Sequence, residues 1–139
     1  MLHRNDIEIM APAGSWESLA AAIHAGANSV YFGIEKLNMR SKSSSNFTTE
    51  DLKKIVQICH ENNVNSYLTV NTILYDDDIR LMHHIVDTAK EAGVTAIIAS
   101  DVAAMMYASS VGVEVHLSAQ TNITIVDALK VYAQYADVV

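Results

Sequence analysis

The 139-residue sequence contains one cysteine, no long apolar run and few basic residues, and each shortage excludes a class of protein. One cysteine cannot form an intramolecular disulfide, which excludes a disulfide-stabilised scaffold and favours a reducing compartment. The apolar runs, such as Ala96–Ala99, are far shorter than the roughly 18 residues of a membrane-spanning helix. Residues Met1–Asp6 lead directly into a strand-like run, unlike a secretion signal. We therefore expect a cytoplasmic protein with no membrane partner.

Nine basic residues against sixteen acidic ones give a net charge of −7. A domain dedicated to binding nucleic acid is usually strongly basic, so this balance argues against that class. It does not exclude an enzyme that acts on RNA. Half of the residues are hydrophobic, which excludes a disordered chain, and the length suits one compact domain spanning residues 1–139.

Apolar periodicity alternates along the chain between two residues and about 3.6, which indicates alternating strands and helices. The predicted strands are Ile7–Ala11, Ser29–Ile34, Asn65–Val70, Thr95–Ala99 and Glu114–Ala119, and a sixth begins at Asp137–Val139. The predicted helices run from Trp16 to about Ala25, from a cap at Thr48 or Thr49 through Glu61, from Asp76 to about Glu91, from about Val102 to Ser110, and over Thr124–Tyr135. Such alternation predicts an α/β fold with a parallel sheet.

One face of several predicted strands is polar or aromatic. Glu8, Tyr31, Tyr67 and His116 alternate with apolar neighbours. In a doubly wound sheet helices cover both faces, and the strands are apolar throughout. In a (β/α)8 barrel only the outer face meets helices, and the inner face can be polar near a site. The pattern favours a truncated TIM-type (β/α)8 barrel over the doubly wound alternative, with five βα units in sequential order and the start of a sixth strand.

Polar residues at the carboxyl ends of the predicted strands form the candidate site, because barrel enzymes place their chemistry there. Asn71, Asp101 and Gln120 lie near those ends, and His116 shares a strand face with Gln120. We expect these four side chains, the candidate catalytic residues, to point into one cavity. A second interpretation of His116, as a hydrogen-bonded core residue, stays open.

Three further residues are candidates for binding substrate. Arg40, near Lys36 and Lys42 in the serine-rich loop after the second strand, is a candidate anion clamp at the cavity rim. The alternative is that these three residues belong to a solvated loop. Tyr31 is expected to line the barrel, and Glu8 to lie lower in it, where a carboxylate must be paired or protonated.

The remaining chemically interesting residues favour structural roles. Cys59 lies on the apolar stripe of its helix and is expected in the core. His83 and His84 are adjacent on a helix, so they point about 100° apart and lack the spacing of a metal site. The run Asp76–Asp78 is expected to cap a helix, because it lacks the alternating ligands of a calcium loop. We therefore predict no metal site in this chain.

Several segments, in order along the chain, resemble the peptidase U32 family, the collagenase-like proteases. Glu8–Leu19 (EIMAPAGSWESL) resembles the family's opening, E-[LI]-[LM]-A-P-A-G-x-x-E-x-L. The resemblance continues at Ala25–Ala27, Val30–Gly33, Asn38–Arg40, Asn46–Phe47, Tyr67–Thr72 and Ser100–Asp101. His116–Thr121 (HLSAQT) is similar to the later family segment H-x-S-[TA]-Q. The resemblance covers nearly the whole chain.

The resemblance implies that the full-length parent is a U32-type peptidase, a hydrolase with collagenase-like activity on peptides. Other family members take part in hydroxylation of RNA or quinones, several with a cysteine-held iron–sulfur cluster, so an RNA substrate is the alternative. The family's paired cysteines would lie beyond Val139, which places any such cluster in the C-terminal part and no cofactor in this chain. A third alternative is a truncated, non-catalytic fragment, and we expect this chain by itself to be inactive.

An open sheet of five strands leaves backbone groups unpaired at its edges. It also leaves barrel-lining side chains uncovered, including Met10, Tyr31 and Tyr67. We therefore expect the chain to self-associate through the exposed sheet edges.

Overall fold

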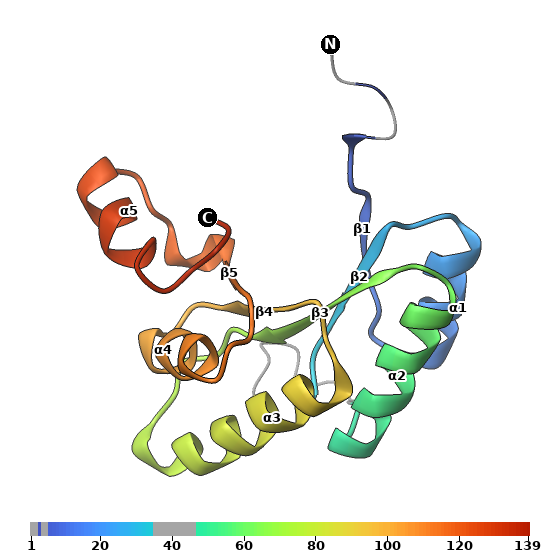
Figure 1. Cartoon of the computed structure of the whole chain (residues 1–139), viewed down its shortest axis with the longest axis horizontal. Helices are drawn as coiled ribbons and strands as arrows, with labels where there is room; N and C mark the ends of the chain where they lie inside the picture. Colours follow the sequence, from blue (N-terminus) through green and yellow to red (C-terminus); the bar gives the residue numbers. More distant parts are fainter. Residues whose placement is uncertain (1–2, 4–5, 35–46) are drawn as a thin grey trace.

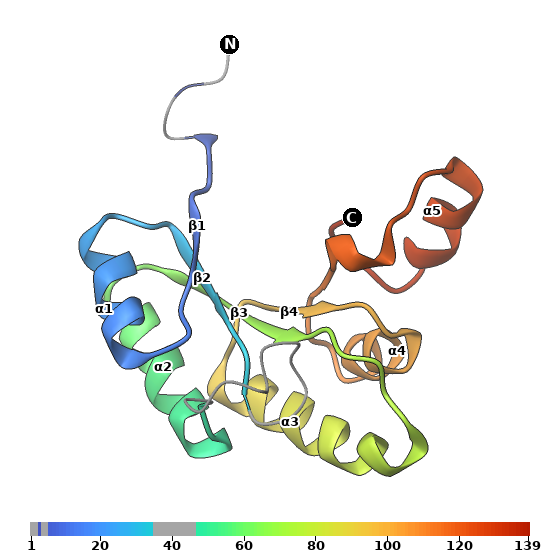
Figure 2. The same cartoon turned by 180° about the vertical axis from the view of Figure 1, so that it is seen from behind.

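A computed structural model of the chain describes residues 3, 6–34 and 47–139 (Figures 1 and 2). Five strands form one parallel sheet in the order β1-β2-β3-β4-β5. They are Met10–Pro12 (β1), Ser29–Phe32 (β2), Asn65–Val70 (β3), Ala96–Ala99 (β4) and Val115–Leu117 (β5). The helices are Trp16–His24 (α1), Thr49–Glu61 (α2), Ile79–Ala92 (α3), Val102–Ser110 (α4) and Val126–Tyr132 (α5), with 3-10 turns at Asp76–Asp78 (η2) and Ala119–Thr121 (η3).

Local signals in the sequence determine where the helices begin and end. The Ser15 hydroxyl accepts a hydrogen bond from the Ser18 backbone N–H at 3.1 Å and so caps α1. In α2, the Asp51 backbone N–H donates to the Thr48 hydroxyl, and the Thr48 backbone N–H donates to the Asp51 carboxylate at 2.9 Å. Gly93 ends α3 with φ of 84°, a left-handed conformation that glycine adopts without strain.

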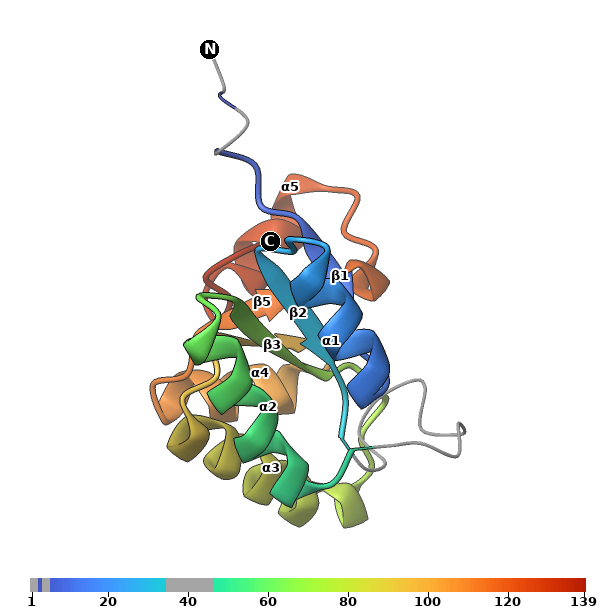
Figure 3. The same cartoon turned by 90° about the vertical axis from the view of Figure 1, so that its right-hand side faces the viewer.

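Helices α1 to α4 cover one face of the sheet, whereas α5 stands apart from them (Figures 1 and 3). On the covered face, Leu68, Ile97 and Val115 form one row across β3, β4 and β5, and all three are fully buried. Ile55 of α2 and Ile85 of α3 belong to the same hydrophobic core. None of the helices that the structure describes is long and apolar enough to cross a membrane.

The opposite, inner face of the sheet carries polar and aromatic side chains, as the alternation predicted. Tyr31 lies in register with Tyr67, and the next row on this face contains Thr69, Ile98 and His116. A doubly wound sheet would place β1 in the interior, but β1 lies at an edge and pairs in sequence order. The barrel-type α/β prediction is therefore confirmed, and the doubly wound alternative is wrong.

The first strand begins later than the sequence predicted, at Met10 instead of Ile7. The Ile9 backbone N–H donates to the side-chain oxygen of Asn28 at 2.8 Å. The Asn28 side chain therefore takes the place of a strand partner, and the regular ladder starts only after this contact.

The fifth strand ends at Leu117, two residues before the predicted end. The Ser118 hydroxyl accepts from the Gln120 backbone N–H at 3.4 Å, and this contact begins the η3 turn. The predicted start of a sixth strand is present as a parallel bridge between His116 and Val138. In it, the Leu117 backbone N–H donates to the Val138 carbonyl at 2.8 Å.

Exposed apolar side chains lie beside both outer strands of the sheet. Ile7 and Ile9 precede β1 and are each 58% exposed, and Val138 and Val139 lie beyond β5 at 47% and 59%. We expect the 139-residue chain to self-associate, because pairing these edges would satisfy backbone groups and bury apolar surface. Sedimentation velocity at micromolar concentration should show a dimer or larger species. A single species of 15.2 kDa would contradict the prediction.

Candidate functional site

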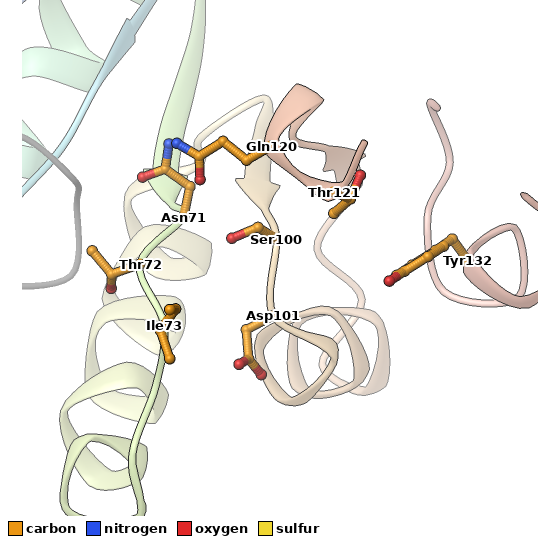
Figure 4. Close-up of a pocket in the computed structure, with 8 residues that line it drawn as sticks. All are labelled: Asn71, Thr72, Ile73, Ser100, Asp101, Gln120, Thr121 and Tyr132. Atoms are coloured by element: carbon orange, nitrogen blue, oxygen red, sulfur yellow. The ribbon is translucent and has the colours of Figure 1, made fainter. Parts of the chain in front are cut away.

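A pocket of about 580 Å³ opens at the carboxyl ends of β3, β4 and β5 (Figure 4). Parallel barrels place their sites at this end of the strands. Its lining residues are Asn71, Thr72 and Ile73 after β3, Ser100 and Asp101 after β4, Gln120 and Thr121 in η3, and Tyr132 on α5. The structure therefore brings three of the four candidate catalytic residues, Asn71, Asp101 and Gln120, to one pocket.

Asp101 connects the pocket with the helix layer. Its Oδ1 accepts a hydrogen bond from the Ala103 backbone N–H at 2.8 Å, which makes Asp101 the N-cap of α4. This bond holds the carboxylate in a fixed position at the pocket. Asp101 therefore combines a structural role with a location where it can contact a ligand.

The other polar groups of the pocket are neutral donors and acceptors. The side-chain amides of Asn71 and Gln120 point toward one another (Figure 4), and each amide can both donate and accept. The Ser100 hydroxyl lies near them, and Ile73 and Tyr132 add apolar surface to the walls. Such a set can bind a planar polar group, such as a peptide unit or the edge of a nucleobase.

His116, the fourth candidate, does not line this pocket. It lies in the row of Thr69 and Ile98, whereas the pocket residues Asn71 and Ser100 are two residues further along β3 and β4. Two strand residues correspond to about 7 Å. His116 therefore lies one layer below the pocket on the inner face, and the expectation that all four candidates point into one cavity holds for three of them.

Four residues, Glu8, Tyr67, Glu114 and His116, form a second polar group on this face, which we call the inner-face cluster. The Tyr67 hydroxyl donates to Glu8 Oε1 at 2.7 Å. His116 Nε2 lies 2.8 Å from Glu114 Oε1, and the ring centroids of His116 and Tyr67 are 5.0 Å apart. The cluster thus connects the segment before β1 with β3 and β5.

The hydrogen bond between Glu8 and Tyr67 changes the acidity of both groups. It lowers the pKa of the Glu8 carboxyl, because the bond favours the ionised form, although partial burial acts in the opposite direction. Burial, and then the same hydrogen bond, raise the pKa of Tyr67 to about 12. The carboxylate of Glu8 is therefore paired with the Tyr67 hydroxyl, in agreement with the expectation that a carboxylate inside the barrel is paired or protonated.

The structure places one of the other two candidate binding residues, Tyr31, outside the pocket. Tyr31 lies on the inner face, in register with Tyr67 and one residue beyond Val30 of the core, and it does not line the pocket. Arg40 lies outside the described residues, as do Lys36 and Lys42.

The cysteine and the histidine pair occupy the structural positions that the sequence favoured. Cys59 is fully buried in α2, and burial raises its pKa to about 11, so the thiol is neutral and a poor nucleophile or metal ligand. His83 stacks on Tyr107, with ring centroids 3.7 Å apart. Asp78 accepts from the Tyr75 backbone N–H at 3.0 Å and so caps η2. Among the described residues no three His, Cys, Asp or Glu side chains converge on a metal position.

Among the residues of these sites that sequence reasoning missed, Glu114 and Tyr132 differ in the signal that they carried. Glu114 carried a signal, because it precedes His116 by two residues and therefore shares its strand face. Tyr132 carried none, because its place in the pocket depends on how α5 is oriented, and periodicity does not determine that orientation.

A parallel sheet in sequential strand order, with helices on one face and a pocket at the strand carboxyl ends, is the architecture of part of a (β/α)8 barrel. Residues 14–137 of the chain match the model of peptidase family U32. The chain belongs to this family.

The relatives of the chain fall into two groups by name, proteases and RNA hydroxylation proteins. The chain is 65% identical over 135 residues to a collagenase from Porphyromonas gingivalis, which covers 97% of this chain and 33% of the relative. An uncharacterized protease from Methanocaldococcus jannaschii is 38% identical over 94% of this chain and 32% of that protein. The tRNA hydroxylation protein P of Helicobacter pylori is 28% identical over 86% of this chain and 29% of that protein. The chain thus spans about a third of the length of these relatives.

Two solved structures share the fold. A U32 peptidase superposes with a TM-score of 0.73 at 9% identity, over 93% of this chain and 55% of that one. The HMG-CoA lyase from Brucella melitensis superposes with a TM-score of 0.69 at 13% identity, over 96% of this chain and 55% of that one. At such low identity these similarities concern the fold alone.

Proposed function

We propose that the protein containing this chain is a U32 peptidase that hydrolyses peptide bonds in collagen-like chains. The observation that carries the proposal is the 65% identity to a collagenase over 97% of the chain. The pocket supports it, because the amides of Asn71 and Gln120 and the carboxylate of Asp101 match the donors and acceptors of an extended peptide. Since the chain spans a third of that relative, the proposal concerns the full-length protein.

The test is incubation of the purified full-length protein with gelatin and with a collagen-like fluorogenic peptide. We expect cleavage that creates new amino termini, which mass spectrometry of the products detects. Heat-denatured protein is the control for contaminating proteases in the substrate. The 139-residue chain is tested in parallel. We expect it to be inactive by itself, and a non-catalytic fragment would give the same result. Intact substrate after incubation with the full-length protein would contradict the proposal.

A second candidate function is hydroxylation of RNA, because further relatives are named for it. The tRNA hydroxylation protein P of Helicobacter pylori is 28% identical over 86% of this chain. An iron–sulfur cluster for this chemistry would need cysteines outside this chain, since Cys59 is a buried neutral thiol. Mass spectrometry of tRNA and rRNA nucleosides from cells with and without the gene tests this function. Loss of a hydroxylated nucleoside on deletion, without any peptidase activity, would favour it.

We also infer that the protein acts in the cytoplasm. The sole cysteine of this sequence, Cys59, is a buried free thiol, which suits a reducing compartment. Fractionation of cells that produce a tagged full-length protein should recover it with cytoplasmic markers, and recovery with secreted proteins would contradict the inference.

Two substitutions of Asp101 should separate its helix-capping role from a role in the reaction. Asparagine caps helices about as well as aspartate, so Asp101→Asn should change the free energy of unfolding by less than about 0.5 kcal/mol. We expect the same variant to lower kcat/KM at least about tenfold, because it removes the charge from the pocket. Asp101→Ala should lose the cap and about 0.5–2 kcal/mol of stability. Urea denaturation and peptidase kinetics measure both effects, and full activity of Asp101→Asn would exclude a catalytic role.

A further inference from the structure

Two exposed side chains, Ile73 and Tyr75, lie in the segment that follows β3 at the carboxyl edge of the sheet, and we call them the apolar ledge. Ile73 is 77% exposed and Tyr75 is 71% exposed, the highest values among the large hydrophobic side chains of the described residues. Single exposed apolar residues are common on protein surfaces. Ile73 differs from such residues, because it also lines the candidate pocket (Figure 4). The ledge therefore begins in the wall of the pocket.

The backbone of the ledge is held in place by the core and by the η2 turn. Leu74, between the two exposed residues, packs against the hydrophobic core. The Tyr75 backbone N–H donates to the Asp78 carboxylate at 3.0 Å, and the Asp78 backbone N–H donates to the Tyr75 carbonyl at 2.8 Å. Because this support is already ordered, a ligand that binds to the ledge does not have to order the backbone.

The charge beside the ledge favours a peptide ligand over a nucleic acid. Asp76 and Asp77 follow Tyr75 directly and are exposed, and the pocket itself contains the carboxylate of Asp101. The ring of Tyr75 could contact either a nucleobase or a proline ring. RNA brings a phosphate with every base, and these carboxylates repel it. A chain of proline and glycine carries no such charge.

A proline-rich chain also fits the spacing of the ledge. Collagen-like sequences have glycine at every third position and many prolines, and their chains adopt the polyproline II conformation, which rises about 3.1 Å per residue. The Cα atoms of Ile73 and Tyr75 are two residues apart and therefore at most about 7 Å from one another. Two residues of a polyproline II chain span nearly this distance, so neighbouring turns of one chain can contact both side chains.

We propose that the apolar ledge binds the proline-rich segment of the substrate that flanks the bond to be cleaved; this inference rests on the proposed peptidase function. The polyproline II conformation exists before binding, so the substrate loses little entropy when its proline rings pack on Ile73 and Tyr75. The peptide unit that follows then enters the pocket beside Ile73. The ledge thus selects substrates by their proline content and is a binding surface, not a catalytic one.

Fluorescence anisotropy of the full-length protein with a labelled peptide of Pro-Pro-Gly repeats measures this binding without cleavage. We expect tighter binding than to a Gly-Ser peptide of the same length. Ile73→Ser and Tyr75→Ser should each weaken binding of the proline-rich peptide roughly tenfold, because each removes one large apolar contact. Tyr75→Phe should bind like the wild type, since the ring makes the contact. Met106→Ser is the matched control, because Met106 is 50% exposed on α4 and does not line the pocket.

Wild-type affinity in both serine variants, or equal affinity for the two peptides, would overturn the inference. Tighter binding of a labelled single-stranded RNA that the serine variants weaken would also overturn it, because the ledge would then bind nucleobases. Urea denaturation of the same variants tests whether another part of the full-length protein covers the ledge. Substitution of exposed residues should leave the denaturation midpoint unchanged, and a marked decrease would overturn the inference. A protein that binds the proline-rich peptide through the ledge but cleaves no peptide would overturn the proposed function alone.

Discussion

Replacing Leu68 by alanine should lower the free energy of unfolding by about 2–5 kcal/mol. Leu68 lies in the middle strand of the sheet, is 0% exposed and pairs in register with Ile97 on the helix-covered face. The substitution removes buried apolar surface and leaves a cavity that the surrounding side chains fill only in part. Urea denaturation, followed by circular dichroism, measures the loss.

Ser66 provides the matched control for this prediction, because it lies on the same strand and the same face. Its hydroxyl is buried, with no hydrogen-bond partner among the described residues. Ser66→Ala removes an unsatisfied polar group, so we expect unchanged stability or a gain of up to about 1 kcal/mol. A large loss in Ser66→Ala, or none in Leu68→Ala, would contradict this account of the core.

Raising the pH from about 9 toward 12 should destabilise the wild-type protein more than Tyr67→Phe. The pKa of Tyr67 is about 12 in the folded protein and 10.0 without the fold, so the unfolded chain loses its proton first. Stability from this group is complete below pH 10 and is lost as the pH rises toward the folded value. A difference of two pKa units corresponds to about 2–3 kcal/mol. Urea denaturation at successive pH values measures the difference between the two proteins.

Tyr107→Phe is the control for tyrosine ionisation at the surface. Tyr107 donates to Asp87 at 2.9 Å, and this hydrogen bond raises its pKa, but the group is exposed to solvent. Its removal should therefore change the alkaline stability less than Tyr67→Phe does. Equal alkaline slopes for the wild type and Tyr67→Phe would contradict the prediction, because they would show that the fold does not raise the pKa of Tyr67.

Sequence periodicity predicted the bounds of an element correctly where the burial of that segment's own residues determines where the element begins and ends. The bounds of β3 at Asn65–Val70 agree with the prediction to the residue, and α4 at Val102–Ser110 agrees with the approximate bounds that were predicted. It failed where one side chain ends a strand early. Ser118 turns the chain into η3, and an alternating pattern that runs through to Ala119 contains no sign of that hydrogen bond.

The same distinction applies to the candidate site. The rule that sites lie at strand carboxyl ends was sufficient to identify Asn71, Asp101 and Gln120, because each directly follows or closely follows a strand. His116 lies within β5, one layer lower, because its register partners Thr69 and Ile98 are two residues before Asn71 and Ser100 of the pocket. Tyr132 could not be found, because its position depends on contacts between segments distant in sequence.

The pocket has one wall formed by the strand ends and another formed by helix α5, and the two walls differ in rigidity. The seven residues of α5, Val126–Tyr132, include none that is buried. Isolated helices of this length are marginal in water, and segments with few buried contacts open at a lower free energy than the core. The amides of α5 should therefore exchange with deuterium long before those of β3 and β4. The side of the pocket formed by Tyr132 can therefore move while Asn71 and Asp101 stay in place. Binding that orders α5 carries a cost in conformational entropy, whereas contacts with the strand ends carry no such cost.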